Sequence, residues 1–241
     1  MSNTLPYTKI PYADRAWHVT TGCTPCSAGC DHCWAQAMLR RFPAMGGTKV
    51  KIWPERLSQP EHTRKPSVIF VAPMGDLFHE DVSEFFMRQV VAMAAYCRAH
   101  TFLFLTKRPL RFMRGVADHY RCPPRNIWLG CSVEDQATAD ERVPLLLESG
   151  WPNLWVSAEP LLEPVSLSPW LDRIGWVVTG CESGAGARPC VDRWLYKLMK
   201  QAQGAGIPHY EKQWRGTTGQ LYKRDPRPQD LPFRLAKWGA E

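Results

Sequence analysis

The sequence predicts an α/β protein folded as a partial (β/α) barrel of about six to seven parallel strands. Short runs of β-branched and aromatic residues recur along the chain, and segments long enough for a helix separate most of them. This alternation of strands and helices predicts that neighbouring strands pair in parallel and are joined by right-handed crossovers. A doubly wound open sheet is the alternative fold that the same alternation allows. Because the runs are too few for a closed barrel of eight strands, we favour the incomplete barrel.

The predicted strands are apolar runs of the length and composition that favour β structure. They cover residues 17–20, 68–72, 101–105, 126–130, 153–156, 176–179 and 207–210.

The helices are predicted from apolar periodicity and from residues that begin or end helices. A helix over 82–99 has Asp81 as its N-cap and Glu84 at the capping-box position. Its apolar stripe is formed by Phe85, Phe86, Val90, Met93, Ala94 and Cys97. Further helices are predicted over 111–119, 136–148 and 191–203, the last ending before Gly204, and one follows the first strand.

Two segments do not follow the alternation of strands and helices. Residues 41–66 contain Pro43, Gly46, Gly47, Pro54, Pro60 and Pro66, and we interpret them as an insertion after the first helix. Residues 215–241 are polar, basic and rich in proline. The predicted organisation is therefore a barrel domain over 1–214 and a C-terminal extension over 215–241.

Composition narrows the class of protein. The chain has 241 residues, of which 44% are hydrophobic and 22% charged, as in ordinary globular proteins. Its longest apolar runs fall far short of the roughly 20 residues that cross a bilayer. No secretory signal is visible at the N-terminus, so a cytoplasmic protein without membrane contact is expected. The net charge of +7 is compatible with a polyanionic partner such as nucleic acid and equally with an evenly solvated basic surface.

Ionisable side chains follow the predicted strands, where (β/α) folds place their chemistry. These side chains are Asp76, Lys107, Glu134, Glu159, Glu182 and Lys212. Because the carboxyl ends of parallel strands lie on one side of the fold, we expect them to surround one polar cavity.

Four of the nine cysteines, Cys23, Cys26, Cys30 and Cys33, lie within eleven residues after the first strand. Thiolates suit zinc and iron–sulfur clusters. Structural zinc sites usually join two cysteine pairs through a longer loop, so the close spacing favours iron and sulfur. Either Cys23 or Cys26 can complete a set of three ligands with Cys30 and Cys33. Both sets leave one iron open to S-adenosylmethionine (SAM), and the narrower spacing is the one associated with radical SAM enzymes.

The cysteine segment has a recognisable pattern, Thr21-Gly22-Cys23-x6-Cys30-x2-Cys33-Trp34-Ala35. It resembles the phage-encoded three-Cys-motif family of radical-SAM-like proteins, most of them described only as phage proteins of unknown function. Similar blocks run through nearly the whole chain, at 74–81, 105–109, 128–136, 157–162, 180–189 and 212–214. The sequence departs from the family at Cys26, where an apolar residue is usual, and at Cys181, where glycine is usual. The resemblance therefore favours Cys23 as the third ligand.

The resemblance implies a radical SAM enzyme in which Cys23, Cys30 and Cys33 hold a [4Fe–4S] cluster. Reductive cleavage of SAM would give methionine and a 5′-deoxyadenosyl radical that abstracts a hydrogen atom from the substrate. We assign Glu159, Glu182, Ser183 and Asp76 to SAM binding. We assign Lys107, Glu134 and Lys212 to the substrate. An external electron donor is required, and the need for a partner protein is left open.

Charge and the resemblance together point to a nucleic acid or a substrate derived from a nucleotide. A hypermodified, thymidine-type base in phage DNA would be altered by an isomerase, an aminomutase or a lyase in the cytoplasm of the host. Such a base must be flipped out of the duplex, and Trp34, Trp53 and Trp214 are candidates for stacking on it. The alternatives are a radical SAM DNA repair lyase and a non-catalytic nucleic-acid-binding protein with an iron–sulfur or zinc staple.

Overall fold

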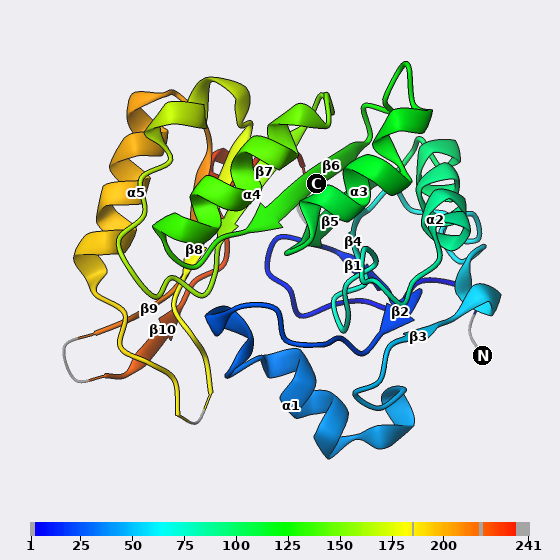
Figure 1. Cartoon of the computed structure of the whole chain (residues 1–241), viewed down its shortest axis with the longest axis horizontal. Coiled ribbons are helices and arrows are strands. Elements are labelled where there is room, and N and C mark those ends of the chain that lie inside the picture. The colour runs from blue at the N-terminus through cyan, green and yellow to red at the C-terminus, as the bar shows by residue number, and fades with distance from the viewer. Residues whose placement is uncertain (1–2, 185, 217–218, 235–241) are drawn as a thin grey trace.

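The computed structural model describes residues 3–184, 186–216 and 219–234, and one eight-stranded sheet dominates it (Figure 1). The strands, in spatial order, are β1 (Arg15–Trp17), β4 (Val68–Val71), β5 (Thr101–Thr106), β6 (Ile127–Ser132), β7 (Leu154–Ala158), β8 (Trp176–Gly180), β9 (His209–Arg215) and β10 (Leu221–Lys223). Neighbours from β1 to β9 are parallel, and β10 is antiparallel to β9. The curled sheet stays open between β1 and β10, which confirms the predicted partial barrel. Its strand order never reverses, so the doubly wound alternative is wrong.

Four helices follow the parallel strands, as the alternation predicted. They are α2 (Glu84–Tyr96), α3 (Pro109–Gly115), α4 (Gln136–Glu148) and α5 (Asp192–Gly204). Helix α4 has the predicted bounds, and the side chain of its N-cap Asp135 forms a capping box with Thr138. Helix α5 is displaced by one residue from the prediction. Helix α3 begins two residues early, because Pro109 is well suited to a first turn, and the 3₁₀ helix η4 (Ala117–His119) follows it.

The predicted start of the second helix is wrong. Ser83, not Asp81, is the N-cap of α2, and its hydroxyl accepts the backbone N–H of Phe86. The backbone N–H of Asp81 instead donates to His79 Nδ1, which keeps residues 79–82 in a turn. Phe85 was assigned to the buried stripe, but its side chain is 66% exposed. The helix ends at Tyr96, three residues before the predicted end.

The predicted strand over 17–20 is two strands that belong to different sheets. Strand β1 ends at Trp17, and β2 (Thr20–Thr21) pairs antiparallel with β3 (Lys51–Ile52). The segment interpreted as an insertion, 41–66, thus supplies a partner strand, with the 3₁₀ helices η2 (Pro43–Met45) and η3 (Pro54–Arg56) on either side of it. Helix α1 (Trp34–Arg41) lies between β2 and this segment.

Apolar side chains pack on both faces of the sheet. On one face the strands contact the apolar sides of α2 to α5 in a large core that includes Trp17, Phe102 and Phe112. On the concave face, half of the residues of a second core are aromatic: its ring residues are Tyr12, Phe70, Trp155, Trp176 and Tyr210, with Trp128 and Phe233 packed against them. The barrel interior is therefore filled at one end, and the polar cavity lies toward the other.

The C-terminal segment is part of this concave core. Trp176 Nε1 donates to the carbonyl of Asp230 at 3.0 Å, and the Tyr210 hydroxyl donates to the carbonyl of Arg224. The 3₁₀ helix η6 (Pro228–Asp230) precedes Leu231, which is buried in the core. The division of the chain after residue 214 stays a prediction, and residues 235–241 of the proposed extension lie outside the described part. Within the described residues, no helix combines the length and apolar character needed to cross a membrane.

Candidate functional site

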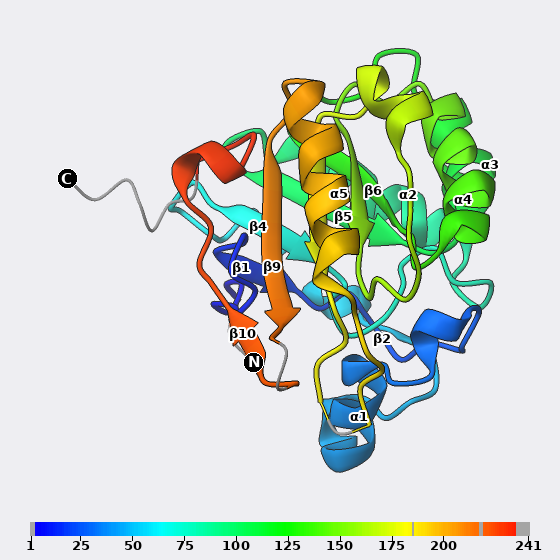
Figure 2. The same cartoon turned by 90° about the vertical axis from the view of Figure 1, so that its left-hand side faces the viewer.

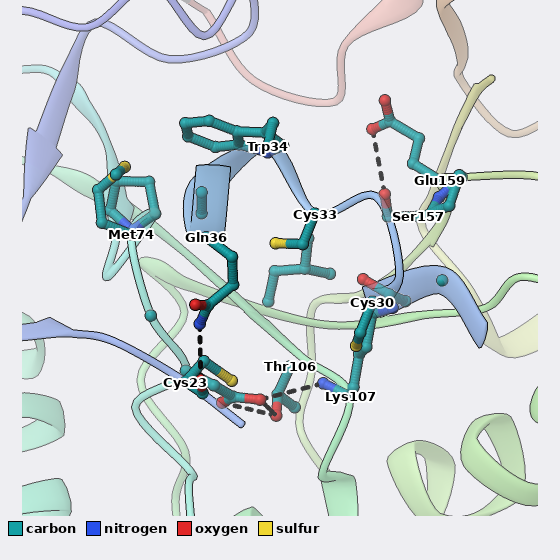
Figure 3. Close-up of a pocket in the computed structure, with 18 of the residues that line it drawn as sticks. Cys23, Cys30, Cys33, Trp34, Gln36, Met74, Thr106, Lys107, Ser157 and Glu159 are labelled. Carbon is teal, nitrogen blue, oxygen red and sulfur yellow. Dashed lines mark hydrogen bonds between the residues drawn. The ribbon is translucent and has the colours of Figure 1, made fainter. Parts of the chain in front are cut away.

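The predicted site residues meet at a cavity of about 240 Å³ at the carboxyl ends of the parallel strands (Figure 3). One wall is the cysteine loop, residues 22–33, which connects β2 to α1 and contains the 3₁₀ helix η1 (Ala28–Cys30). The segments after the strands contribute the assigned residues Asp76, Lys107, Glu159, Glu182 and Ser183. Lys212 also lines the cavity, but it lies inside β9, which continues to Arg215 and not only to the predicted end at residue 210. Glu134 is the exception, since it lies behind this lining. All four thiols of the loop, those of Cys23, Cys26, Cys30 and Cys33, line the same cavity.

Backbone contacts fix the start of the cysteine loop. The Gly22 N–H donates to the carbonyl of Met74 at 2.9 Å, and Gln36 Nε2 donates to the carbonyl of Cys23 at 2.6 Å. Gly22 has φ of +79°, and a Cβ there would overlap the backbone carbonyl of Lys49. Only glycine fits this crossing. The loop ends at Cys33, which is the N-cap residue of α1.

Arg108 joins the first cysteine to the strand ends. Its Nη1 donates to Cys23 Sγ at 3.6 Å and to Asp76 Oδ2 at 3.3 Å, and its Nη2 donates to the carbonyl of Thr24 at 3.0 Å. Asp76 also accepts the Thr106 hydroxyl at 2.9 Å. Because protein groups already bond the carboxylate of Asp76, its first role in this structure is to orient Arg108.

Glu134 lies beneath the cysteine loop with a fully buried side chain. It forms an ion pair with Lys107 Nζ and a second with Arg142 Nη1 at 3.1 Å. The hydroxyl of Ser27, in the cysteine loop, donates to Glu134 Oε1 at 2.9 Å. One carboxylate therefore connects the loop, the end of β5 and helix α4, and it holds the Lys107 ammonium at the cavity wall.

Gly29 explains how the loop approaches this buried charge. A Cβ at Gly29 would lie 2.6 Å from Glu134 Oε1 and 2.7 Å from Lys107 Nζ. Contacts this short do not occur between real side chains, so any larger residue would displace either the loop or the ion pair.

Glu159 and Lys212 face each other across the cavity wall. Lys212 Nζ lies 2.9 Å from Glu159 Oε1, and the Ser157 hydroxyl donates to Glu159 Oε2 at 3.2 Å. The ammonium attracts Oε1 but lies outside hydrogen-bonding geometry. Within the described part of the chain, Glu159 Oε1 is thus a buried oxygen that accepts no hydrogen bond.

Glu182 is bound by an arginine that the sequence did not single out. The backbone N–H of Arg188 donates to Glu182 Oε2 at 2.8 Å, and the guanidinium donates to both carboxylate oxygens. Burial raises the pKa of Glu182, but the bonds from Arg188 outweigh it and lower the pKa overall. Arg188 Nη2 also donates to the carbonyl of Ala28 at 2.6 Å, and Nη1 lies 3.3 Å from Asp31 Oδ2. This arginine therefore ties the 181–190 loop to the cysteine loop.

The thiols of the cysteine loop differ in acidity. A hydrogen bond from Cys26 and the nearby Lys107 ammonium lower the pKa of Cys30 to about 4, although burial opposes this. Burial and the Asp76 carboxylate raise the pKa of Cys23 to about 11. Donation to Cys30 raises the pKa of Cys26. Among Cys23, Cys26 and Cys30, Cys30 is thus the thiol best prepared to be a thiolate.

The donor set at this cavity fits an iron–sulfur cluster. Nowhere in the described residues are three or more His, Cys, Asp or Glu side chains grouped to hold one metal ion. A cluster contains several metal atoms, so its thiolate ligands stand further apart than the ligands of one ion. The side chains of Cys23, Cys30 and Cys33 surround the same hollow (Figure 3), and Cys26 lines it too. The choice between Cys23 and Cys26 stays open.

The three tryptophans proposed for base stacking have different surroundings. Trp34 lines the cavity and is 48% exposed. The ring of Trp53 is covered by Lys51 Nζ at 3.9 Å and by the Arg56 guanidinium at 4.0 Å, and its Nε1 donates to Thr21. Its faces are therefore already occupied. Trp214 stacks on Tyr222 with the ring centroids 5.6 Å apart.

Sequence reasoning missed the partners of the assigned residues, namely Ser27, Arg108, Arg142 and Arg188. Arg108 and Arg188 stand in blocks that carry the family resemblance, so the signal for them was present: Arg108 directly follows Lys107, and Arg188 follows Ser183 by five residues. Arg142 is an internal residue of α4, and no strand-end or spacing rule selects it.

Comparison with solved structures gives the same fold. A single mutant of spore photoproduct lyase, with phenylalanine in place of a tyrosine, matches with a TM-score of 0.53 and 13% identity, covering 93% of this chain and 72% of that one. A double mutant of the lyase, solved with bound AdoMet and dinucleoside spore photoproduct, matches with a TM-score of 0.51 and 12% identity over the same shares. The complex of the lyase with dinucleoside spore photoproduct matches with a TM-score of 0.50 and 13% identity over 74% of this chain. In that match this chain spans 58% of the length of the lyase.

Comparison of sequences assigns the family. None of the curated proteins matches the chain. The model of the family DUF5131, described as protein of unknown function, matches residues 7–232. The chain therefore belongs to the DUF5131 family.

Proposed function

We propose that this protein is a radical SAM enzyme, with Cys23, Cys30 and Cys33 as ligands of a [4Fe–4S] cluster in the cavity. The observation that carries the proposal is that these thiols and the polar strand ends line one cavity. The fold shared with a lyase solved with bound AdoMet supports it. The resemblance of the cysteine segment to phage-encoded three-Cys-motif proteins supports it independently.

Each assigned side chain has a distinct task in this proposal. With both groups bound, the cluster supplies the electron that cleaves SAM and so provides the hydrogen-abstracting chemistry. Glu159 accepts a ribose hydroxyl of SAM through Oε1, which pairs with the Lys212 ammonium at 2.9 Å and receives no hydrogen bond from the described residues. Ser183 offers a hydroxyl at the cavity wall. Glu182 and Asp76 contact SAM only where it displaces one of their arginine bonds.

Two lysines that line the cavity, Lys107 and Lys212, are assigned to the substrate. Lys107 and Lys212 bind an anionic group of the substrate, and each is held by a carboxylate, Glu134 and Glu159 respectively. Glu134 does not line the cavity, so it acts on the substrate through Lys107 as a positioning residue. The proposed substrate is a nucleic acid or a nucleotide, specifically a hypermodified, thymidine-type base in phage DNA, altered by an isomerase, aminomutase or lyase in the host cytoplasm. An external electron donor reduces the cluster.

A DNA repair lyase is the second candidate. The solved structures with the same fold include one bound to a dinucleoside photoproduct, and this favours a base lesion as substrate. The two candidates share the cofactor and differ in the base that enters the cavity.

The first test is the metal content and SAM binding of anaerobically reconstituted protein. We expect about four irons per chain, and release of 5′-deoxyadenosine when the protein is reduced with dithionite and given SAM, measured by mass spectrometry. Stoichiometric zinc without iron refutes the proposal that the protein is a radical SAM enzyme. The proposal is also refuted if the protein neither binds SAM nor forms 5′-deoxyadenosine when nucleosides or phage DNA are present. A non-catalytic nucleic-acid-binding protein with a metal staple then takes its place.

A variant tests the assignment of Glu159. Glu159→Gln removes the charged acceptor and should raise the SAM dissociation constant about tenfold, the equivalent of about 1.4 kcal/mol, with unchanged iron content. Glu163→Gln, an exposed position close by in sequence, is the matched control. Equal SAM affinity in both variants contradicts the assignment. Incubation with phage DNA carrying modified thymidines, and with DNA carrying thymine photoproducts, separates the two candidate substrates.

A further inference from the structure

Helix α1 presents an exposed apolar face beside the cysteine loop. The face consists of Trp34, Met38, Phe42 and Met45, which we call the α1 face. Their side chains are 48%, 37%, 43% and 39% exposed. The first three are four residues apart, close to one helical turn, and the Phe42 N–H still donates to the carbonyl of Met38. Trp34 and Met38 lie in α1, Phe42 is the C-cap of α1, and Met45 lies in η2. Exposed apolar side chains gathered in one region mark an interaction site more often than scattered ones do.

The segment that carries the α1 face is positively charged, and the exposed Asp31 and Glu55 flank it. Residues 32–54 contain Arg40, Arg41, Lys49 and Lys51 and no Asp or Glu. Arg40 and Arg41 are exposed, and the Arg41 guanidinium lies 5.3 Å from the centre of the Phe42 ring. Arg41 follows Trp34 by seven residues, about two turns, so it projects on the same side of α1.

The α1 face is continuous with the cavity. Cys33 is the N-cap of α1, and both Cys33 and Trp34 line the cavity. Trp34 lies next to Cys33 at the head of α1 (Figure 3), and the rest of the helix extends away from the sheet at one end of the molecule (Figure 2). A protein seated on this face would therefore lie beside the cysteines proposed to hold the cluster.

We propose that the α1 face is the docking site of a small acidic one-electron carrier protein that reduces the cluster. This inference rests on the proposed function. Aromatic residues, methionine and arginine are the residues enriched in protein interfaces, and they make up this face. Redox encounters use small interfaces, which suits a patch of four apolar side chains. The basic border steers and orients an acidic partner.

Other occupants fit the face less well. A symmetric dimer through α1 would bring Arg40 and Arg41 of two copies together with no acidic residue from 32–54 between them. Nucleic acid is bound chiefly through phosphate contacts from many cations, whereas the centre of this face is apolar.

The test compares two reductants and two matched double variants. Arg41→Glu with Phe42→Ala alters the α1 face. Lys200→Glu with Tyr196→Ala is the control, because Lys200 Nζ lies 5.6 Å from the exposed Tyr196 ring on α5. A flavodoxin serves as probe, and its affinity for the protein is measured by calorimetry at low salt, independently of turnover.

We expect the α1 variant to raise the dissociation constant for flavodoxin at least about tenfold, and the control to leave it unchanged. Formation of 5′-deoxyadenosine should fall in the α1 variant with flavodoxin, flavodoxin reductase and NADPH, but remain at the wild-type rate with dithionite. Equal loss with both reductants, equal flavodoxin affinity in all proteins, or no wild-type binding to flavodoxin or to an acidic ferredoxin overturns the proposal. So does a dimer, or single-stranded DNA binding, that the α1 variant abolishes. Absence of wild-type activity with dithionite contradicts the proposed function instead, because the binding measurement does not depend on SAM cleavage.

Discussion

Replacing Glu134 by glutamine should destabilise the protein strongly, even without cofactor. The carboxylate side chain is 0% exposed and forms ion pairs with Lys107 and Arg142, whose side chains are 18% and 4% exposed. In the variant, Lys107 can turn toward the cavity and become hydrated. Arg142 remains buried without a carboxylate.

The expected cost follows from that stranded charge. Removing one partner of a buried ion pair destabilises proteins by about 3–5 kcal/mol. Because one of the two cations can be hydrated and the amide oxygen still accepts a hydrogen bond, we expect the lower end, about 3 kcal/mol. For a chain of this size each kcal/mol lowers the melting temperature by about 2–4 °C, so Glu134→Gln should lower it by about 6–12 °C.

The assay is thermal unfolding of the apoprotein by calorimetry at pH 7. Glu141→Gln, at an exposed position on the same helix, removes the same charge and should change the stability by less than about 0.5 kcal/mol. If Glu134→Gln melts within about 2 °C of this control, the buried carboxylate is not the anchor inferred from its contacts.

Three further predictions concern the loop and the sheet. Alanine at Cys23, Cys30 or Cys33 should abolish iron binding on reconstitution, whereas Cys26→Ala should retain it; the reverse result for Cys23 and Cys26 would move the site to the narrower spacing. Gly29→Ala should cost about 1–3 kcal/mol in denaturant unfolding, because its Cβ would lie 2.6 Å from Glu134 Oε1, while Gly204→Ala, with open space around its Cβ, should not destabilise. Burial and the nearby Arg224 lower the pKa of His209 from 6.5 to about 4, so the unfolded chain binds the proton first on acidification and stability falls as the pH drops through the window from 6.5 to 4. The free energy of unfolding should therefore fall by about 2 kcal/mol between pH 7.5 and pH 5. Chemical unfolding at both pH values should show a smaller fall for His209→Gln than for the wild type. An equal fall in the variant would contradict the assignment of this pH dependence to His209.

The sequence was informative for several features that local rules determine. Helix α4 has the predicted bounds because Asp135 and Thr138 form a cap from neighbouring residues. The strand-end rule predicted a common cavity, since topology alone brings the carboxyl ends of parallel strands together. The cysteine loop was predicted from spacing, and its thiols line one cavity.

What the sequence did not reveal depends on distant contacts. The strand-end rule treats Glu134 and Glu159 alike. Only the structure shows that Glu134 is buried behind the cavity wall, whereas Glu159 lines the cavity. Arg142 reaches Glu134 from inside a helix, and Arg188 reaches Ala28 across 160 residues. The break between β1 and β2 could not be predicted, because β2 pairs with a strand in a segment interpreted as an insertion.

The concave core has a consequence for how the protein is made. It contains Tyr12 near one end of the chain and Leu231 near the other, with Phe233 packed against it. A ribosome that has synthesised only the parallel strands holds a chain whose Trp176 and Tyr210 still lack their hydrogen-bond acceptors at Asp230 and Arg224. Domains begin to fold from the N-terminus during synthesis, yet this half-barrel can complete its interior only after residue 233 has left the exit tunnel. Until then the aromatic side chains of the concave core remain exposed to water and to other nascent chains.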